Sequence, residues 1–596
     1  MLGRAATIFL VRSPRPAVIR LARLTGSWGA RTVSYAYDQF GQAVRKDVAG
    51  KVTTYAYDWA GRLLQAAGPD SEILYVYDRR GRTKTELVDS RAMNYAYDIL
   101  GRRARRTTPT GAVTEYGYDA AGRIARMTSG GREITFTHDA AGRELQRAFG
   151  NSLALASAWD EAGRICAQHL TTGDRSLNHR HYAHRADGYL TSVTDDLSGT
   201  RNFDLDPTGR VTAVHAEDWT ERYAYDAAGN QTTASWPGTQ PGHDATGPRS
   251  YTGTSLTRAG NVRFEHDALG RVTLRQRTRL SRKPDTWRYE WDAEDRLAAV
   301  VTPDGTRWRY RYDPLGRRTA KQRLADDGET VAEEVRFSWD GTTLCEQTIH
   351  TPGLSHVVAL TWDHRGLVPL SQTERLLTPD THQEEIDRRF FAIATDLVGT
   401  PTELVDESGE IAWRARSTLW GTTAWARSST AYTPLRFPGQ YYDPETGLHY
   451  NLFRHYDPET GRYTSPDPLG LSPAPNPVAY LHNPFTVCDP PRPVAVLTVQ
   501  GSGLADGQGA QTPVVPVPAA RHRPELRAAV DPAGRPGSPR RRRPAGRLDH
   551  GGQVDRRRQP FRMEEVHVQP QIRILRRGPA HRSGRQAAGP QRGSRR

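Results

Sequence analysis

The nine residues TYAYDWAGR (54–62) return at a spacing of 20 or 21 residues along the first part of the chain. Six further copies share their layout: SYAYDQFGQ (34–42), LYVYDRRGR (74–82), NYAYDILGR (94–102), EYGYDAAGR (115–123), TFTHDAAGR (135–143) and ASAWDEAGR (156–164). Less regular copies continue as far as YRYDPLGR (310–317). A fixed period of this length is the sequence signature of a repeat architecture.

Each repeat predicts about one β-hairpin. Tyr55 and Tyr57 lie two positions apart, so both rings project from one face of a strand. Asp58 then begins an Asp-x-x-Gly turn, in which the carboxylate accepts hydrogen bonds from the backbone ahead of it and Gly61 takes the positive φ. One hairpin cannot bury its aromatic face alone, so successive hairpins must share a continuous sheet. We interpret the repeated Asp, Gly and Arg as structural residues rather than catalytic ones.

The composition supports an all-β protein, because Tyr (25) and Trp (13) are abundant while Met (4) is scarce. The formal charge of +15 is confined to one end: residues 491–596 hold 22 Arg and 7 acidic residues, so residues 1–490 are neutral. The body therefore has no basic excess for nucleic acid, and only the Arg-rich tail is a candidate for such binding. No apolar run of 18 residues predicts a membrane span.

The cysteines and histidines predict no metal site. Cys166, Cys345 and Cys488 are too far apart for a zinc-ligand spacing, and we expect them to be small buried hydrophobic residues. His449 and His455 flank turns of the later sequence, where lone strand histidines usually pack. We predict no cofactor.

A second, more specific block follows the repeats. It comprises TDLVGTPTELVDESGEIAWRARSTLWG (395–421) and LRFPGQYYDPETGLHYNLFRHYDPETGRYTSPDPLGL (435–471). Together with the repeats it resembles the rearrangement-hotspot (Rhs), or YD-repeat, family, which includes the C components of insecticidal toxin complexes and the teneurins. The resemblance implies a β-hairpin solenoid coiled into a hollow shell, or cocoon. It also implies a repeat-associated core that spirals inwards as a plug, with a C-terminal toxin held inside.

These patterns divide the chain into five parts. We predict a ragged N-terminal segment (1–33), a YD-repeat β-shell (34–340), a continuation of the shell (341–394), the Rhs core (395–490) and a disordered Arg/Pro/Gly-rich tail (491–596). We interpret the first segment as the start of an open reading frame, with a targeting signal as the alternative. The tail is interpreted as the product of a frameshift that replaced a toxin. Its alternatives are a genuine disordered segment that binds anionic partners and an unusual toxin.

The resemblance also implies that the core cleaves its own chain with two aspartates. It assigns them to Asp467 in PDPLGL and Asp489 in PFTVCDP, where one carboxyl group keeps a proton and the other is ionised. Arg462 is a third candidate, which either holds a carboxylate or polarises the scissile carbonyl, or is an ordinary strand arginine. The family pattern continues after Asp489 with Pro-x-Gly-Leu, whereas this chain reads Pro-Pro-Arg-Pro (490–493), so we expect cleavage to be impaired.

The function implied is an encapsulation shell of a polymorphic Rhs-type toxin, whose self-cleaving core acts as an aspartic-type peptidase on its own chain alone. Its enclosed cargo is its own C-terminal segment, and secretion machinery and an immunity protein are the other implied partners. The implied location is bacterial, cytoplasmic before export and secreted or cell-surface in function. The alternative is a cell-surface, carbohydrate-binding or adhesion protein without proteolysis.

Overall fold

The computed structural model describes residues 21–26, 29–378, 385–468, 470, 476–486 and 569–570. The chain divides into two compact units, one made of Met1–Thr498 with Val568–Arg596 and the other of Val499–His567. Every described residue belongs to the first unit. The fold of that unit is a long antiparallel sheet in which each strand pairs with the next strand along the chain.

The sheet contains 38 strands and runs in two passes. The strands of the first pass are β1 (Leu21–Gly26), β2 (Gly29–Tyr37), β3 (Gly41–Val48), β4 (Lys51–Tyr57), β5 (Leu63–Ala67), β6 (Glu72–Tyr77), β7 (Thr83–Val88), β8 (Arg91–Tyr97), β9 (Arg103–Thr107), β10 (Val113–Tyr118), β11 (Ile124–Ser129), β12 (Arg132–His138), β13 (Glu144–Phe149), β14 (Leu153–Trp159), β15 (Ile165–Thr172), β16 (Arg175–His184), β17 (Leu190–Asp195), β18 (Gly199–Leu205), β19 (Val211–His215), β20 (Thr220–Tyr225) and β21 (Gln231–Ser235). A single turn of 3-10 helix, η1 (His243–Ala245), leads to the second pass.

The second pass continues the same alternation. Its strands are β22 (Gly247–Thr252), β23 (Ser255–Ala259), β24 (Val262–His266), β25 (Val272–Arg277), β26 (Asp285–Trp291), β27 (Leu297–Val301), β28 (Arg307–Tyr312), β29 (Arg318–Leu324), β30 (Val331–Asp340), β31 (Thr343–His350), β32 (Val357–Arg365), β33 (Val368–Leu377), β34 (Glu385–Thr395), β35 (Pro401–Asp406), β36 (Ile411–Ser417) and β37 (Thr423–Trp425). A short strand, β42 (Gln569–Pro570), pairs in parallel with Gly41 and Gln42 of β3.

The repeated turn has the chemistry expected from its sequence. In the second repeat, Gly61 N–H donates to the Asp58 carbonyl oxygen at 3.0 Å, and Gly61 has a φ of 80°. The Asp58 carboxylate accepts hydrogen bonds from the Ala60 and Arg62 backbone N–H groups. The pairing register shifts between Ala56 and Tyr57, which marks a bulge beside the turn. The prediction of one hairpin per repeat is confirmed.

The repeated arginine and second tyrosine link each hairpin to the next. Arg82 Nε donates to the Asp78 carboxylate of its own turn at 2.7 Å, and its guanidinium lies 4.4 Å from the centre of the Tyr97 ring in the following repeat. The Tyr97 hydroxyl then donates to the Thr83 carbonyl oxygen at 2.7 Å. Equivalent tyrosine bonds are made by Tyr77, Tyr118, Tyr225 and Tyr312. We call this arrangement the Arg–Tyr ladder.

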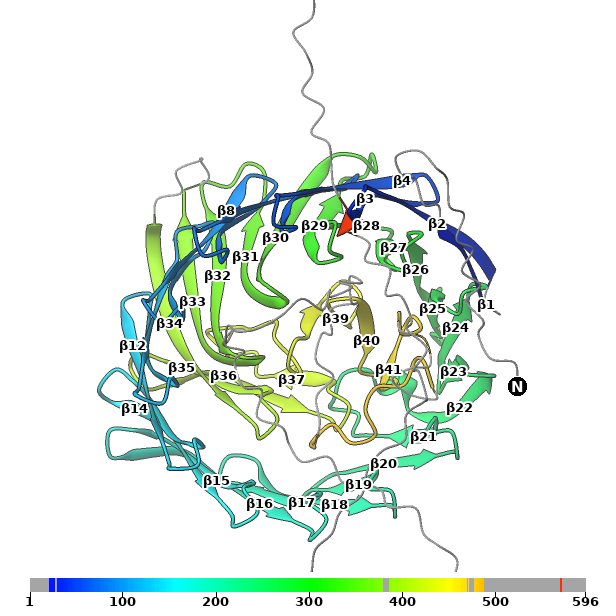
Figure 1. Ribbon diagram of the computed structural model, residues 1–596. Coiled ribbons are helices and arrows are strands. Elements are labelled where there is room, and N and C mark those ends of the chain that lie inside the picture. Colours follow the sequence, from blue (N-terminus) through cyan, green and yellow to red (C-terminus); the bar gives the residue numbers. More distant parts are fainter. Residues whose placement is uncertain are drawn as a thin grey trace, which may run out of the picture. The chain divides into compact units, whose positions relative to one another are not determined.

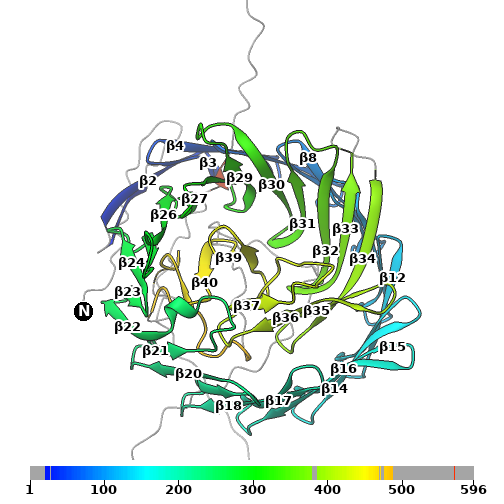
Figure 2. The same ribbon diagram turned by 180° about the vertical axis from the view of Figure 1, so that it is seen from behind.

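The second pass lies inside the first where the two overlap (Figures 1 and 2). Arg180 and Glu403, which meet between the passes, are 223 positions apart, and Arg106 and Asp363 are 257 apart, so one circuit takes roughly 240 residues. Charged contacts bridge the passes, such as Lys46 with Glu294 and Arg106 with Asp363, at 2.5 and 2.8 Å. One apolar cluster also combines both passes, with Ile134 and Phe149 from the first and Phe390 from the second.

The later sequence forms a separate four-stranded sheet inside the two passes (Figure 1). Its strands are β38 (Tyr441–Asp443), β39 (Leu448–Asn451), β40 (Arg454–Asp457) and β41 (Arg462–Tyr463). Three turns join them, and in the first and third the N–H groups of Gly447 and Gly461 donate to the Asp443 and Asp457 carbonyl oxygens. We call this sheet and its turns the plug sheet. The preceding residues of the predicted core, as far as β37, belong to the long sheet.

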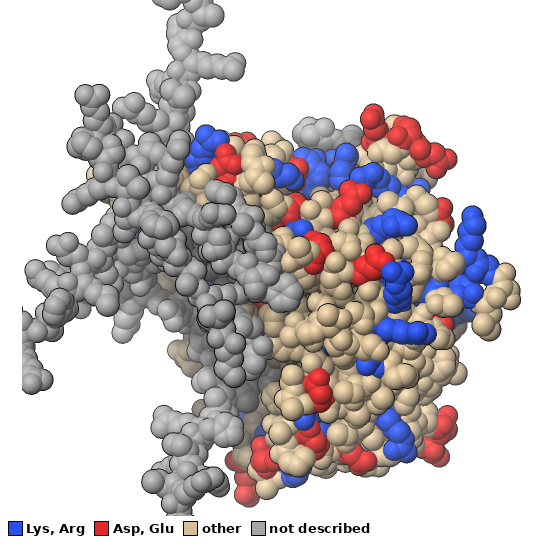
Figure 3. All heavy atoms as spheres, turned by 90° about the vertical axis from the view of Figure 1, so that its right-hand side faces the viewer, with Lys and Arg blue, Asp and Glu red and all other residues tan. Residues whose placement is uncertain are grey.

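The prediction of an all-β repeat protein is confirmed, since the described residues contain no α-helix and hence no helix that could cross a membrane. Cys345 is fully buried and Cys166 half-buried, whereas Cys488 lies outside the described residues. Basic and acidic side chains are interspersed over the described part of the face in Figure 3, as a neutral body predicts. The predicted tail (491–596) lies outside the described residues except for β42.

Candidate functional site

Asp467, the first predicted catalytic residue, follows the last strand of the plug sheet. Its N–H donates to the Pro477 carbonyl oxygen at 2.7 Å, and its own carbonyl oxygen accepts a hydrogen bond from Gly470 N–H at 2.8 Å. The chain returns beside β41 in this region, because Tyr463 N–H donates to the Val478 carbonyl oxygen. The backbone on both sides therefore fixes the position of this carboxyl group.

The Asp467 carboxylate is paired with Arg454, a residue that the sequence did not single out. Arg454 Nη1 lies 2.9 Å from Asp467 Oδ2, and each side chain is 13% exposed. The Arg454 guanidinium also stacks on the Tyr463 ring, 3.6 Å from its centre. A stacked and ion-paired guanidinium holds a carboxylate in a defined orientation. One sequence feature could have pointed to Arg454. In the order Arg-His-Tyr-Asp (454–457), the alternation of a strand places Arg454 on the same face as Tyr456.

Arg462 lies elsewhere. Its guanidinium donates to Asn230 Oδ1 at 2.6 Å and to the Thr254 carbonyl oxygen at 2.5 Å, and it stands 5.0 Å from the centre of the Tyr251 ring. Burial lowers the pKa of this guanidinium, although Tyr251 acts in the opposite direction. Among the described residues, its partners belong to the long sheet and do not include Asp467. The catalytic role predicted for Arg462 stays a prediction. Its contacts join the plug sheet to the long sheet, which we call the wall.

Asp489, the second predicted catalytic residue, lies outside the described residues. The last described stretch before it ends at Thr486, three positions earlier. In this stretch Asn483 Nδ2 donates to the Gly209 carbonyl oxygen at 2.9 Å, and the Phe485 ring centre lies 4.8 Å from that of Phe203. The segment that leads to Asp489 is thus seated on the turn between β18 and β19. The pairing of Asp467 with Asp489 stays a prediction.

Buried charges attach the plug sheet to the wall. Asp443 accepts two hydrogen bonds from Arg318, at 2.7 and 3.0 Å, and one from Lys321 at 3.1 Å. Burial alone would raise the pKa of Asp443, but Arg318 and Lys321 outweigh it and lower the pKa to about 2. Asp443 also begins the first turn of the plug sheet, and the sequence did not reveal this second role of its carboxylate.

Other carboxyl groups at this boundary hold their protons more tightly. Burial raises the pKa of Asp457 to about 6, with a further contribution from the nearby Glu459. On the wall, burial raises the pKa of Glu221 to about 7, although hydrogen bonds from the Tyr223 hydroxyl and the Leu419 N–H oppose this. The carboxyl groups of Asp457 and Glu221 therefore titrate near neutrality, at the contact between the wall and the predicted Rhs core.

The two core histidines are packing residues. Both are almost completely buried, with 1% of His449 and 2% of His455 exposed. Burial lowers the pKa of His455 to about 3 and that of His449 well below its usual range. Within the part of the chain that the structure describes, no group of three or more His, Cys, Asp and Glu side chains is arranged to hold a metal ion.

Family models match both halves of the fold. The RHS repeat model matches residues 97–133, 118–151 and 291–330, and the RHS protein model matches residues 393–426. The chain belongs to the RHS repeat family. The RHS repeat matches coincide with hairpins of the Arg–Tyr ladder. The RHS protein match coincides with the inner strands that lead to the plug sheet.

Two of the curated relatives of this RHS protein are named as toxins. The chain is 33% identical over 350 residues to double-stranded DNA deaminase toxin A of Burkholderia cenocepacia, an alignment that covers 56% of this chain and 23% of the relative. It is 31% identical over 384 residues to toxin protein Tse5 of Pseudomonas aeruginosa, covering 55% and 28%. The chain therefore spans about a quarter of the length of these relatives.

Among solved structures, the RHS protein is similar to the Photorhabdus luminescens Tc holotoxin pore. The TM-score is 0.60 at 18% identity, and the match covers 80% of this chain and 27% of the other. At this identity the likeness concerns the fold. It extends over both passes of the sheet and so includes far more of the chain than the family models do.

Proposed function

We propose that the chain is the encapsulating shell of an Rhs-type toxin, with its own C-terminal segment as cargo. What supports this most is the nested arrangement of the plug sheet within two passes of the wall, attached by the buried Asp443 cluster. A wall that surrounds an inner block in this way can separate a following segment from water and proteases. The toxin names of the relatives agree with such a role.

We further propose that the core of this lineage cuts its own chain with Asp467 and Asp489. One carboxylate takes a proton from a water molecule while the other carboxyl group donates a proton to the scissile carbonyl oxygen. The water oxygen bonds to the carbonyl carbon, and the peptide nitrogen leaves with a proton as the new amino terminus. Arg454 positions Asp467 for this step through the 2.9 Å ion pair.

In this chain the residues that follow the second aspartate differ from the family pattern. Arg492 and Pro493 stand where the family pattern has Gly and Leu, and a proline restricts the extended backbone that a bound substrate segment needs. We therefore propose that cleavage is impaired and that the toxin has been lost. In this proposal, secretion machinery and an immunity protein are partners of the intact lineage, which acts after export from a bacterial cytoplasm.

A denaturing gel with intact mass measurement tests the cleavage proposal. The expected result is one species of 66.5 kDa. Two species with a break near residue 492 would show that the altered bond is still cut. Reading the other two frames of the coding DNA tests the loss of the toxin, because a frameshift restores Asp-Pro-x-Gly-Leu directly after residue 488.

Limited trypsin digestion tests encapsulation. Most of the 22 arginines of residues 491–596 are potential trypsin cleavage sites, so an enclosed tail survives digestion until the wall is unfolded by denaturant. Rapid loss of the tail from an otherwise intact body would contradict the proposal. Digestion in rising denaturant supplies the matched control, because tail and wall should then become sensitive together.

A further inference from the structure

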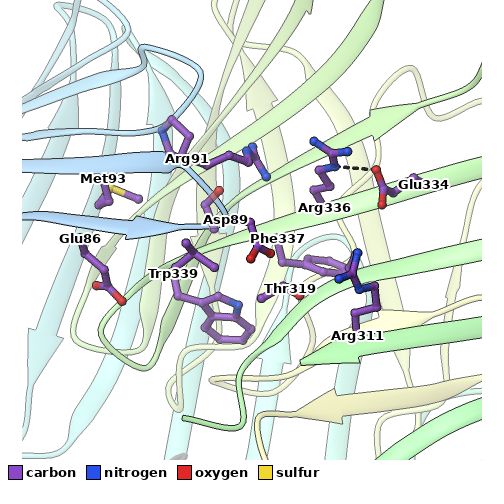
Figure 4. Close-up of a pocket in the computed structure, with 14 residues that line it drawn as sticks. Glu86, Asp89, Arg91, Met93, Arg311, Thr319, Glu334, Arg336, Phe337 and Trp339 are labelled. Carbon is purple, nitrogen blue, oxygen red and sulfur yellow. Dashed lines mark hydrogen bonds and ion pairs between the residues drawn. The ribbon is translucent and has the colours of Figure 1, made fainter. Parts of the chain in front are cut away.

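A cavity of about 370 Å³ lies between the two passes of the sheet (Figure 4). Arg91 and Met93 of β8 line it from the first pass. Arg336 and Trp339 of β30 line it from the second, with Arg311 of β28, which is two strands away in the sheet. Its size falls in the range of small-molecule sites, which combine apolar walls with a few convergent polar groups.

The three carboxylates that line the cavity already have partners. Glu86 accepts hydrogen bonds from Arg317 and from the Tyr75 hydroxyl. Glu334 accepts from the Gln322 amide and from Arg336. The third, Asp89, accepts from the Glu72 backbone N–H at 3.0 Å.

The hydrogen-bond donors of the cavity are less well matched. The carboxylate oxygen paired with Arg91 is Glu346 Oε1, 3.9 Å from Arg91 Nη2, which is beyond hydrogen-bond distance. Within the described residues, the hydrogen bond of the Arg311 guanidinium goes to the Asp70 carbonyl oxygen. The side-chain hydroxyls of Thr319 and Ser338, each 7% exposed, donate to no described residue. Arg91, Thr319 and Ser338 are therefore the candidate donors of the cavity, since Arg311 already donates to Asp70 and Arg336 donates through Nε to Glu334.

The charge of Arg91 is partly buried beside the cavity. Its side chain is 23% exposed, and burial lowers the pKa of the guanidinium. Glu346 raises that pKa, the positive charge of Arg336 lowers it, and Glu334 and Asp89 raise it. A partly buried cation whose paired carboxylate is 3.9 Å away gains from an anion placed at hydrogen-bond distance.

We propose that this cavity binds a small carboxylate with an apolar body, held by Arg91 and Arg336 through the carboxylate and by Met93 and Trp339 through the apolar part. A guanidinium matches the two oxygens of a carboxylate in one plane, which favours this anion over a halide. The hydroxyls of Thr319 and Ser338 supply further donors. A bound carboxylate then joins the two passes of the wall.

Calorimetric titration of the full chain with benzoate tests the proposal, with acetate and inorganic phosphate as comparison probes. The expected result is saturable benzoate binding that is at least about 10-fold tighter than that of either comparison probe. The Arg91→Gln variant should weaken benzoate binding by about 10-fold or more. Arg105→Gln, on the exposed face of the neighbouring strand, is the matched control and should leave binding unchanged.

Arg91→Lys separates binding from folding, because it keeps the charge but loses the planar fork. It should melt at the temperature of the wild type and still bind benzoate more weakly. Absence of saturable binding, equal affinity for benzoate and phosphate, or unchanged affinity in Arg91→Gln would each overturn the proposal. The first of these outcomes would identify the cavity as a water-filled gap between the passes.

Discussion

Arg318 and Asp443 form an ion pair with 0% and 1% of their side chains exposed, although they are 125 residues apart in the sequence. Arg318 begins β29 of the wall and Asp443 ends the first strand of the plug sheet. Four aromatic rings surround the guanidinium, those of Tyr310, Phe337, Tyr441 and Tyr450. This pair therefore attaches the plug sheet to the wall.

Asp443→Asn should reduce the free energy of unfolding by about 3 to 5 kcal/mol, because it leaves two buried cations with one carboxylate fewer. Lys321 would keep Glu445 as its partner, while Arg318 would lose its charged partner. Chemical denaturation measures the change. Glu265→Gln is the matched control, since its pair with Arg263 is exposed and should contribute less than about 1 kcal/mol. Equal losses in the two variants would contradict the attachment role.

Tyr97→Phe should destabilise the protein by about 1 kcal/mol, because the Thr83 carbonyl oxygen loses its hydroxyl donor. Tyr97→Trp should be better tolerated than Tyr97→Phe. The reason is that Trp159 occupies the equivalent position in another repeat and donates its Nε1–H to the Glu144 carbonyl oxygen at 2.8 Å. Denaturation midpoints of the two variants provide the comparison. A Phe variant as stable as the wild type would show that the ring alone matters in the Arg–Tyr ladder.

The buried Glu221 should make stability depend on pH. Its pKa is about 7 in the folded protein and near 4.5 in the unfolded chain, so between these values unfolding releases a proton. The contribution of Glu221 to the free energy of unfolding should therefore fall by up to about 3 kcal/mol as pH rises from about 4.5 to 7, and then level off. Glu221→Gln removes this contribution while keeping an acceptor for the Leu419 N–H, so the difference in stability between wild type and variant should change with pH by that amount. The exposed Glu115→Gln should retain the slope of the wild type.

Restoring the family pattern after Asp489 should restore cleavage if the dyad is intact. The double substitution Arg492→Gly and Pro493→Leu recreates Asp-Pro-x-Gly-Leu at residues 489–493. We expect two fragments on a denaturing gel, with a break directly after residue 493. Adding Asp467→Asn should return the protein to one full-length species. A double variant that remains uncut would assign the defect to the dyad itself rather than to the scissile segment.

Arg454→Gln in that restored background should slow cleavage without abolishing the fold. Its loss would free the Asp467 carboxylate from the 2.9 Å pair, whereas the backbone bond from Asp467 to Pro477 would remain. The rate of fragment appearance is the measurement, and its pH profile distinguishes a positioning role from a structural one. Arg462→Gln offers the contrast, because its contacts with Asn230 and Thr254 predict a loss of stability instead.

The parts of the fold that the sequence predicted are those that depend on local chemistry. The Tyr-x-Tyr-Asp-x-x-Gly-Arg pattern predicts each hairpin because the turn, the bulge and the ring faces all arise within nine residues. The pair of Arg318 with Asp443 and that of Arg106 with Asp363 could not be predicted, since they depend on how many residues complete one circuit. Arg454 was missed for a similar reason. Its pairing with Asp467 depends on the path of the chain after the plug sheet, which the local sequence pattern does not reveal.

The Arg–Tyr ladder has a consequence for how such a wall changes over generations. Where the next unit carries the tyrosine, the arginine serves both the aspartate before it and that tyrosine, so these units present the same two ends. Excising residues 63–82 would bring Arg62 to the position that Arg82 holds beside Tyr97, with Thr83 again supplying the acceptor. Recombination between repeated stretches of the gene can therefore add or remove whole units and leave every junction chemically complete.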